Sequence, residues 1–150
     1  MQNNWEIVRV TENIVGEIVA IERATFTLPW SAESFTAEIQ NPDSYFTAAV
    51  ADGHAVGFCV LRYYEDEGEI LNIAVSEGYR SNGIGHGLIS DALSFADSHG
   101  VKRVFLEVRK SNWTAISLYA KNGFQPISVR RNYYEQPVED ALIMLKEVSL

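Results

Sequence analysis

Glu107 stands in a setting that suggests acid–base chemistry. It interrupts the apolar run 104–108, and the two-residue period of a strand would place it on the same face as Phe105 and Arg109. A carboxylate in such a strand either pairs with a cation or takes part in a function. Arg103 and Arg109 are the nearby candidates for an ion pair. The functional alternative is a general base, which accepts a proton from a reacting group.

Tyr119 lies on a predicted helix together with Asn112 and Ala115. Asn112 precedes Tyr119 by seven residues, or two helical turns, so that the three residues can share one face. A phenol has a pKa of about 10, is therefore protonated at neutral pH, and can donate a proton to a leaving group. The alternative is a tyrosine that packs in the core with its hydroxyl group at the edge.

A glycine-containing loop, residues 80–85, links an apolar segment to an amphipathic helix. It reads Arg-Ser-Asn-Gly-Ile-Gly. Such a turn into a helix N-terminus offers a pyrophosphate unpaired backbone N–H groups, close backbone approach and a favourable dipole, and Arg80 could add a charged contact. The loop matches neither the dinucleotide-binding pattern nor the P-loop pattern. The alternative is a strand-to-helix turn that uses glycine for its shape alone.

The elements that would position these residues follow from hydrophobic periodicity and turn signals. Strands are predicted over residues 5–10, 45–51, 55–64, 68–75, 101–109, 124–131 and 141–148. Helices are predicted over 12–26, over a short stretch after the N-cap Ser31, and over 84–98 and 112–121. Asp52 and Gly53 mark a hairpin turn, and Gly100 caps the third helix. This order predicts a mixed α/β sheet with helices packed against it.

Length and charge narrow the class of protein. The chain has 150 residues, of which 47% are hydrophobic and 21% charged, which favours one folded domain over disorder. Its 12 Lys and Arg against 20 Asp and Glu give a net charge of −8, which disfavours a nucleic-acid binder and suits a positively charged partner. No segment approaches the ~20 apolar residues of a membrane span, and no signal peptide is evident. The single cysteine, Cys59, favours a reducing cytoplasmic setting.

The cysteine and histidines suggest no further chemistry. Cys59 is single, so it cannot form an intramolecular disulfide, and it lies in an apolar run where a small buried side chain is expected. His54, His86 and His99 have no metal-ligand spacing, and no metal site is predicted.

The loop and its surroundings resemble the GNAT superfamily of acetyl-CoA-dependent N-acetyltransferases. The superfamily signature, Gln/Arg-x-x-Gly-x-Gly/Ala after a central strand, matches Arg80, Gly83 and Gly85 after residues 70–75. The order of elements also matches, so residues 1–150 are expected to form one N-acetyltransferase domain with the GNAT-like fold, a mostly antiparallel twisted sheet flanked by helices. Further segments are similar to the bacterial ribosomal-protein-alanine N-acetyltransferases: Pro-Trp-Ser at 29–31, Leu-Glu-Val-Arg at 106–109, Ser-Asn at 111–112, Leu-Tyr at 118–119, Asn-Gly-Phe at 122–124, Arg-Arg-Asn-Tyr-Tyr at 130–134 and Glu-Asp-Ala at 139–141.

The resemblance implies a role for each residue that matches the family. Glu107 matches the general base and Tyr119 the general acid, and acetyl-CoA would be the co-substrate. Ser81 and His86 depart from the family, because close relatives often carry basic residues there; their loss could weaken cofactor affinity, although the backbone N–H groups remain. The residues implied to bind acetyl-CoA are Ile73, Ala74, Val75, Arg80, Ser81, Asn82, Gly83, Ile84, Gly85, His86 and Asn112.

Five residues are candidates for contact with the acceptor substrate: Trp30, Asn72, Tyr133, Tyr134 and Glu139. Aromatic side chains with a polar edge often line peptide grooves. The alternative for Trp30, Tyr133 and Tyr134 is ordinary packing under a loop. Asn72 could instead satisfy a neighbouring backbone group. Glu139 could attract a basic peptide tail or simply be solvated.

The function expected from the resemblance is transfer of an acetyl group from acetyl-CoA to the α-amine of a protein N-terminus, by direct attack in a ternary complex. An α-amine suits a carboxylate base, because deprotonation at neutral pH costs roughly 1 kcal/mol, against about 5 kcal/mol for a lysine. The family suggests the N-terminal alanine of a small-subunit ribosomal protein with a basic tail as partner, without nucleic acid or membrane. Two alternatives stay open: another amine, such as a lysine, polyamine or drug, and a CoA-binding module with little catalysis.

Overall fold

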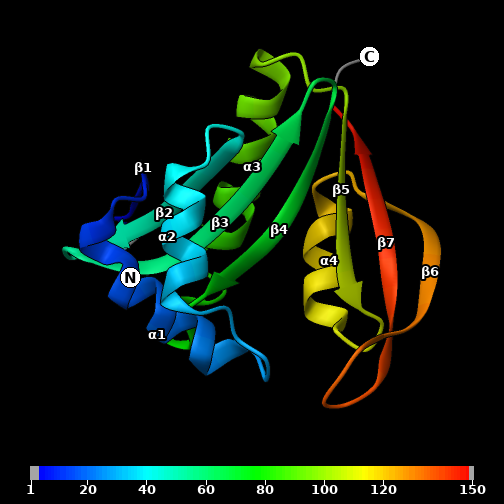
Figure 1. Cartoon of the computed structure of the whole chain (residues 1–150), viewed down its shortest axis with the longest axis horizontal. Helices are drawn as coiled ribbons and strands as arrows, with labels where there is room; N and C mark the ends of the chain where they lie inside the picture. The colour runs from blue at the N-terminus through cyan, green and yellow to red at the C-terminus, as the bar shows by residue number, and fades with distance from the viewer. Residues whose placement is uncertain (1–3, 149–150) are drawn as a thin grey trace.

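Residues 4–148 are described by a computed structural model, in which four α-helices and seven strands follow one another in the predicted order (Figure 1). The helices are α1 (Val15–Thr25), α2 (Ala32–Gln40), α3 (Ile84–Ser98) and α4 (Trp113–Lys121). The strands are β1 (Glu6–Arg9), β2 (Ser44–Ala51), β3 (His54–Tyr64), β4 (Glu67–Val75), β5 (Arg103–Arg109), β6 (Gln125–Tyr134) and β7 (Glu139–Glu147).

Local signals place most of the helix ends where the sequence predicts them. The Ser31 hydroxyl caps α2 by accepting from the backbone N–H of Ser34 at 3.1 Å. Gly100 follows α3 in the left-handed region, with φ of 80°. The helix predicted over 12–26 differs, because a 3-10 turn, Glu12–Ile14, precedes α1. Ile14 itself lies outside the helical region, with φ of −109° and ψ of 7°, so α1 begins only at Val15.

The strands form one sheet in the order β1-β2-β3-β4-β5-β7-β6. Within residues 4–148, β4 and β5 make the single parallel pair, and all other neighbours are antiparallel. A parallel pair needs a long crossover connection, which α3 supplies. The predicted mixed, mostly antiparallel sheet is therefore confirmed.

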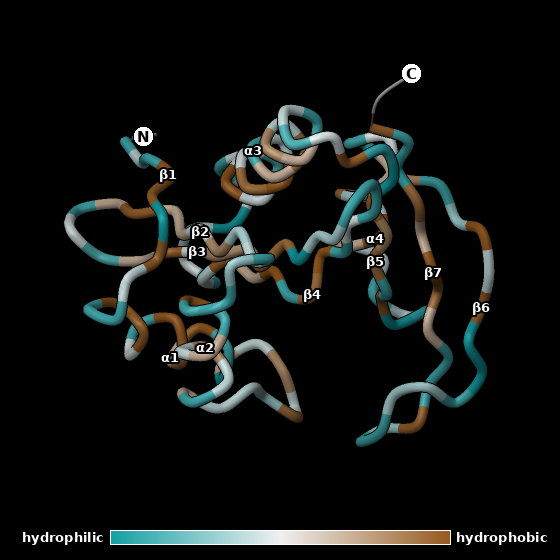
Figure 2. Tube along the Cα trace, turned by 45° about the horizontal axis from the view of Figure 1, so that its top comes forward, coloured by the Kyte–Doolittle hydropathy of each residue, from teal (hydrophilic) through white to brown (hydrophobic). Residues whose placement is uncertain are grey.

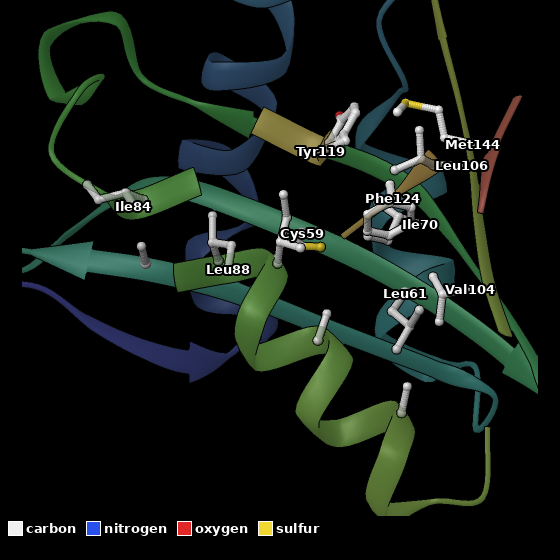
Figure 3. Close-up of a cluster of buried hydrophobic side chains, with 14 of the residues drawn as sticks. Cys59, Leu61, Ile70, Ile84, Leu88, Val104, Leu106, Tyr119, Phe124 and Met144 are labelled. Atoms are coloured by element: carbon white, nitrogen blue, oxygen red, sulfur yellow. The ribbon is translucent and has the colours of Figure 1, made fainter. Parts of the chain in front are cut away.

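Helices cover both faces of the sheet. Figure 2 shows α3 on one side of β2 and β3 and the pair α1 and α2 on the other, with hydrophobic segments turned inward. One core lies between the sheet and α1 and α2, around Phe35 and Phe58. The second lies between the sheet and α3 and includes Leu61 and Leu88 (Figure 3). Cys59 sits within this second core, where burial raises the pKa of its thiol to about 12, so it is the small buried side chain that was expected.

Candidate active site

The two parallel strands at the centre of the sheet separate before they end. Pairing between β4 and β5 covers only four positions and stops at Ile70 and Leu106. Beyond that point β4 continues to Val75 and β5 to Arg109, and Figure 1 shows the two strand ends diverging. A β-bulge starts at the same place, since Leu61 pairs with Ile70 but Val60 pairs with Asn72. Bulges bend and twist a strand, which here turns β4 away from β5.

The separation leaves backbone groups of β4 facing an open edge. Ser76 donates its N–H to the Val56 carbonyl at 2.8 Å, on the β3 side. Because antiparallel pairing alternates, Ala74 also bonds toward β3, while Ile73 and Val75 face the edge from which β5 has departed. The side chain of Ala74 is buried in the core under α1 and α2. Ile73, Ala74 and Val75 are all implied to bind acetyl-CoA, and of these Ile73 and Val75 have the available backbone positions.

The loop after β4 delivers the chain to the N-terminus of α3. Gly83 is the N-cap residue, with φ of 80°, a conformation that costs glycine little and other residues considerably more. No side chain caps this end, and its first turn contains no acidic residue. The first backbone N–H groups of α3 are therefore left to bind an anion. Gly85 allows α4 to approach, because a Cβ there would lie 3.0 Å from a methyl carbon of Leu118.

Arg80 and Asn82 stabilise this loop in the structure. The Arg80 Nε donates to the Val75 carbonyl at 3.0 Å, which occupies one of the open-edge groups of β4. Asn82 donates from Nδ2 to the Tyr79 carbonyl at 3.2 Å. Ser81, which has φ of 68°, and His86 are exposed beside them.

Glu107 lies on the sheet face opposite α3, in a groove of about 630 Å³. Its neighbours Leu106 and Val108 point into the core beneath α3, which turns Glu107 to the other side. The groove is lined by Arg62, Tyr63, Tyr64, Glu67, Gly68, Glu69, Phe105, Leu106, Glu107, Arg130, Tyr133 and Ile143.

The ion-pair partner of Glu107 is a residue of β6, which the sequence did not predict to lie beside it. Arg130 of β6 approaches the Glu107 carboxylate at 3.1 Å, whereas Arg103 pairs with Asp66 at 3.2 Å and Arg109 with Glu139 at 3.3 Å. The two nearby candidates for an ion pair, Arg103 and Arg109, therefore pair elsewhere, and Arg130 takes that place. Arg130 lines the groove because β6 follows β7 and β5 in the sheet order. The separation of Arg130 and Glu107 in the sequence does not indicate this contact. A hydrogen bond to Glu107 also raises the pKa of Tyr133.

Glu69 is a groove residue that sequence reasoning missed. It is half-buried on β4 and pairs in register with Phe105 of β5. Burial, and secondly the negative charge of Glu107, raise the pKa of the Glu69 carboxyl group. The signal in the sequence that could have identified Glu69 is an acidic residue within the largely apolar strand β4.

Tyr119 lies on the α3 side of the sheet, opposite Glu107. It is buried beside Phe124, with their ring centroids 6.1 Å apart, at one end of the second core (Figure 3). Burial raises the pKa of its phenol well above the usual value, so the group stays protonated at neutral pH. Asn112, predicted to share its helix face, is the N-cap of α4 and accepts from the Ala115 N–H through Oδ1 at 3.2 Å.

Asn72 belongs to a buried network rather than to an open surface. Its Nδ2 donates to Glu22 Oε1 at 2.9 Å, and the other carboxylate oxygen of Glu22 accepts from the Trp30 backbone N–H at 2.9 Å. The Trp30 ring packs on Phe35, with a centroid distance of 5.2 Å. The partner of Asn72 is thus the Glu22 side chain and not a neighbouring backbone group, and the network holds the α1–α2 loop against β4.

Two of the remaining predicted substrate residues line hollows, Tyr133 the groove that contains Glu107 and Glu139 a separate one. Tyr133 is exposed in the groove, and Tyr134 packs edge-on against it at 5.0 Å. Arg109 lies over the Tyr134 ring at 4.6 Å. Glu139 lies in a separate hollow of about 380 Å³, where it accepts from the Ser111 N–H at 2.6 Å. It is therefore not brought together with Glu107.

Residues 4–148 contain neither a membrane-spanning helix nor a metal-binding cluster. Between residues 4 and 148, no helix is long and apolar enough to cross a membrane. In the same range, no cluster of three or more His, Cys, Asp or Glu side chains could hold a metal ion.

Comparison with known proteins identifies the family. The family model described as Acetyltransferase (GNAT) family matches residues 15–124. The chain belongs to the GNAT acetyltransferase family. This GNAT chain is 38% identical over 131 residues to a putative ribosomal protein bS18-alanine N-acetyltransferase of Bacillus subtilis strain 168, with 87% of each chain covered. It is 33% identical over 133 residues to the ribosomal protein bS18-alanine N-acetyltransferase of Escherichia coli strain K12, covering 87% of this chain and 88% of that one.

The fold of the chain also matches that of a solved structure. The crystal structure of the ribosomal-protein-S18-alanine N-acetyltransferase from Escherichia coli superposes with a TM-score of 0.90 at 30% identity, covering 97% of this chain and 95% of that chain. The GNAT chain is thus an acetyltransferase, and the predicted GNAT-like fold is confirmed.

The site fits acetyl-CoA, which the GNAT family uses. The uncapped N-terminus of α3, with a left-handed glycine at its N-cap, suits a pyrophosphate. The open edge of β4 at Ile73 and Val75 suits an extended arm that hydrogen-bonds to a strand. These two features lie in succession along one segment of the chain, in the order in which such a cofactor would need them.

Proposed function

We infer that the enzyme acetylates the α-amine of a protein N-terminus with acetyl-CoA, and that its substrate is the N-terminal alanine of a ribosomal protein related to bS18. The observation that carries this proposal is the position of Glu107, a carboxylate on the groove face next to the point where β4 and β5 separate. Its support from relatives is the naming of the Bacillus subtilis and Escherichia coli proteins as alanine N-acetyltransferases.

The acceptor peptide is assigned to the groove and acetyl-CoA to the α3 side of the same strands. Bound acetyl-CoA would supply an activated acetyl carbonyl group. The N–H groups on the open edge of β4 would orient it and stabilise negative charge on its oxygen. Glu107 would accept a proton from the amine, directly or through one water. Tyr119, kept protonated by burial, would donate a proton to the departing sulfur.

The groove also bears on the choice of substrate. Three carboxylates line it, those of Glu67, Glu69 and Glu107, against the two guanidinium groups of Arg62 and Arg130. Together with the net charge of −8 of the chain, this composition favours a cationic N-terminal peptide over an acidic one.

A peptide panel with free-CoA release as the readout tests the proposal. One peptide begins with Ala-Arg and has a basic tail, the second is identical but acetylated at its N-terminus, and the third is N-terminally blocked and carries an internal lysine. We expect CoA release only with the first peptide, and Glu107→Gln as a matched control should remove most of it. Release with the blocked lysine peptide, or with none of the three, would contradict the N-terminal assignment.

A further inference from the structure

Arg130 and Glu107 form an ion pair inside the groove, with 3.1 Å between a guanidinium nitrogen and a carboxylate oxygen. The Glu107 side chain is 19% exposed, whereas the arginine side chain is 59% exposed. The residue assigned as the base thus has a cation of the chain itself beside it, and the proposed function gives that cation no role.

An irregularity in β6 brings Arg130 to this position. The register of β6 with β7 shifts between Arg130 and Tyr134. Such bulges re-aim side chains, and this one allows Tyr133 to line the groove together with Arg130. The guanidinium carbon lies 5.2 Å from the centre of the Tyr133 ring, and the Tyr133 hydroxyl group hydrogen-bonds with Glu107. Arg130 therefore contacts both an aromatic ring and a carboxylate.

The charged side chains of β3 and β4 do not supply Glu107 with a second cation. Arg62 of β3 and Glu67 of β4 each pair with a residue outside the groove lining. Glu69 of β4 is a second carboxylate near Glu107, and burial and then the charge of Glu107 raise its pKa, while Arg130 opposes that rise. Among the groove residues, all of which lie within 4–148, Arg130 is therefore the single cation that pairs with a groove carboxylate.

The two phenols that face Glu107 from β6 add no charge. Burial raises the pKa of Tyr134 to about 12, and the hydrogen bond to Glu107 raises that of Tyr133. Both groups are therefore neutral over the pH range in which an amine acceptor titrates. Without Arg130, the carboxylates of Glu69 and Glu107 would remain near each other with no groove cation paired to either.

An acceptor ammonium group would be drawn to such carboxylates. At pH 7 about nine tenths of an α-amine with a pKa of about 8 is protonated. An ammonium nitrogen has no lone pair and cannot attack a thioester. An ammonium group paired with Glu107 would therefore occupy the base without reacting. A cation already beside the base opposes that pairing, because like charges repel.

We propose that Arg130 determines the protonation state in which the acceptor binds, because its charge opposes the ammonium group and so selects the neutral amine at Glu107. This inference rests on the proposed N-terminal acetyltransferase function. The first proton of the ammonium group goes to solvent before binding. When the neutral nitrogen bonds to the acetyl carbon and the carbon–sulfur bond breaks, the nitrogen gives its one surplus proton to Glu107. Arg130 acts through the base and is a positioning residue.

The selection predicts a split between kcat and KM. Loss of the Arg130 charge should stabilise a bound ammonium group about fivefold, as expected for one charge in a partly exposed site. The midpoint of the kcat profile should then move to higher pH. Below that midpoint, kcat and KM for the peptide should both fall by up to about fivefold in Arg130→Met. The ratio kcat/KM, which depends on the free amine, should stay within about twofold of wild type.

The experiment measures kcat and KM of the whole enzyme for the Ala-Arg peptide between pH 6 and 9.5, with saturating acetyl-CoA. Arg130→Lys keeps the charge and should follow wild type. Arg131→Met removes the same charge from the next, exposed residue of β6 and is the matched control. A fall in kcat of Arg130→Met at unchanged KM, or an equal change in Arg131→Met, would overturn the proposal.

A binding measurement tests the same selection without turnover. Two peptides share one sequence after their first group, which is N,N,N-trimethylglycyl in one and 3,3-dimethylbutanoyl in the other. These groups have the same shape, and only the first is charged. In the presence of CoA, Arg130→Met should shift the ratio of the two Kd values about fivefold in favour of the cation, and Arg130→Lys should keep the wild-type ratio. An unchanged ratio in Arg130→Met would overturn the proposal. If the wild type acetylates no N-terminal peptide, the proposed function fails, and the ratio still decides whether Arg130 opposes a cation in the groove.

Discussion

Glu22 is a buried carboxylate on α1 that contacts β4, and its removal gives a sharp test of the structure. The side chain is 1% exposed on α1 and accepts from Asn72 Nδ2 and from the Trp30 backbone N–H, both at 2.9 Å. It thereby joins the bulged part of β4 to the α1–α2 loop. We predict that Glu22→Ala destabilises the protein and raises KM for the peptide.

The magnitude follows from the two donors that the substitution leaves without an acceptor. A buried donor deprived of its partner costs about 1–3 kcal/mol. The removal of a carboxylate whose burial raises its own pKa offsets part of that cost. We therefore expect a loss of about 2–4 kcal/mol, which a domain of ordinary stability survives, and a fall in Tm of about 4–16 °C.

Urea unfolding of Glu22→Ala, with exposed Glu12→Ala as control, measures this loss. Glu22→Gln tests the direction in which the free energy of unfolding changes with pH. Because the pKa of folded Glu22 is raised, its stabilising contribution is fully present below the unfolded pKa of about 4.3 and is lost as pH rises through the folded value. Wild type should therefore lose stability relative to Glu22→Gln as pH rises across that window. A difference that grows in favour of wild type, or a Glu22→Ala loss no larger than that of Glu12→Ala, would refute the reasoning.

Three further substitutions test the roles assigned to the site. Glu107→Gln should lower kcat by about 10²–10⁴-fold, as expected for loss of a general base, with acetyl-CoA affinity unchanged in calorimetry; an equal loss of affinity would rule out the base assignment. Tyr119→Phe should slow the chemical step in single-turnover kinetics while the fold is retained, because only the proton donor is removed; a wild-type single-turnover rate would exclude that role. Gly83→Val should weaken acetyl-CoA binding by at least about 10-fold, since a branched side chain at φ of 80° costs about 1–2 kcal/mol and crowds the helix N-terminus; unchanged affinity would remove the phosphate site from this loop.

Local patterns in the sequence determined most of the secondary structure. Hydrophobic periodicity, the Ser31 cap and the glycines at positions 53, 83 and 100 depend on contacts within a few residues, so the order of elements could be predicted without a partner. The same holds for the buried setting of Cys59 and for the placement of Glu107 on a strand and Tyr119 on a helix. A family signature in the loop then indicated the fold as a whole.

Which side chains meet across the sheet was decided only by the tertiary structure. Arg130 reaches Glu107 because β7 lies between β5 and β6 in the sheet, an order that no local pattern encodes. Glu69 lines the same groove as Glu107 because β4 and β5 pair in parallel, with Glu69 opposite Phe105. Asn72 is engaged by Glu22, fifty residues away in the chain. Each of these contacts depends on strand order and register, which are set by long-range packing, and so the residue types were visible in the sequence while their partners were not.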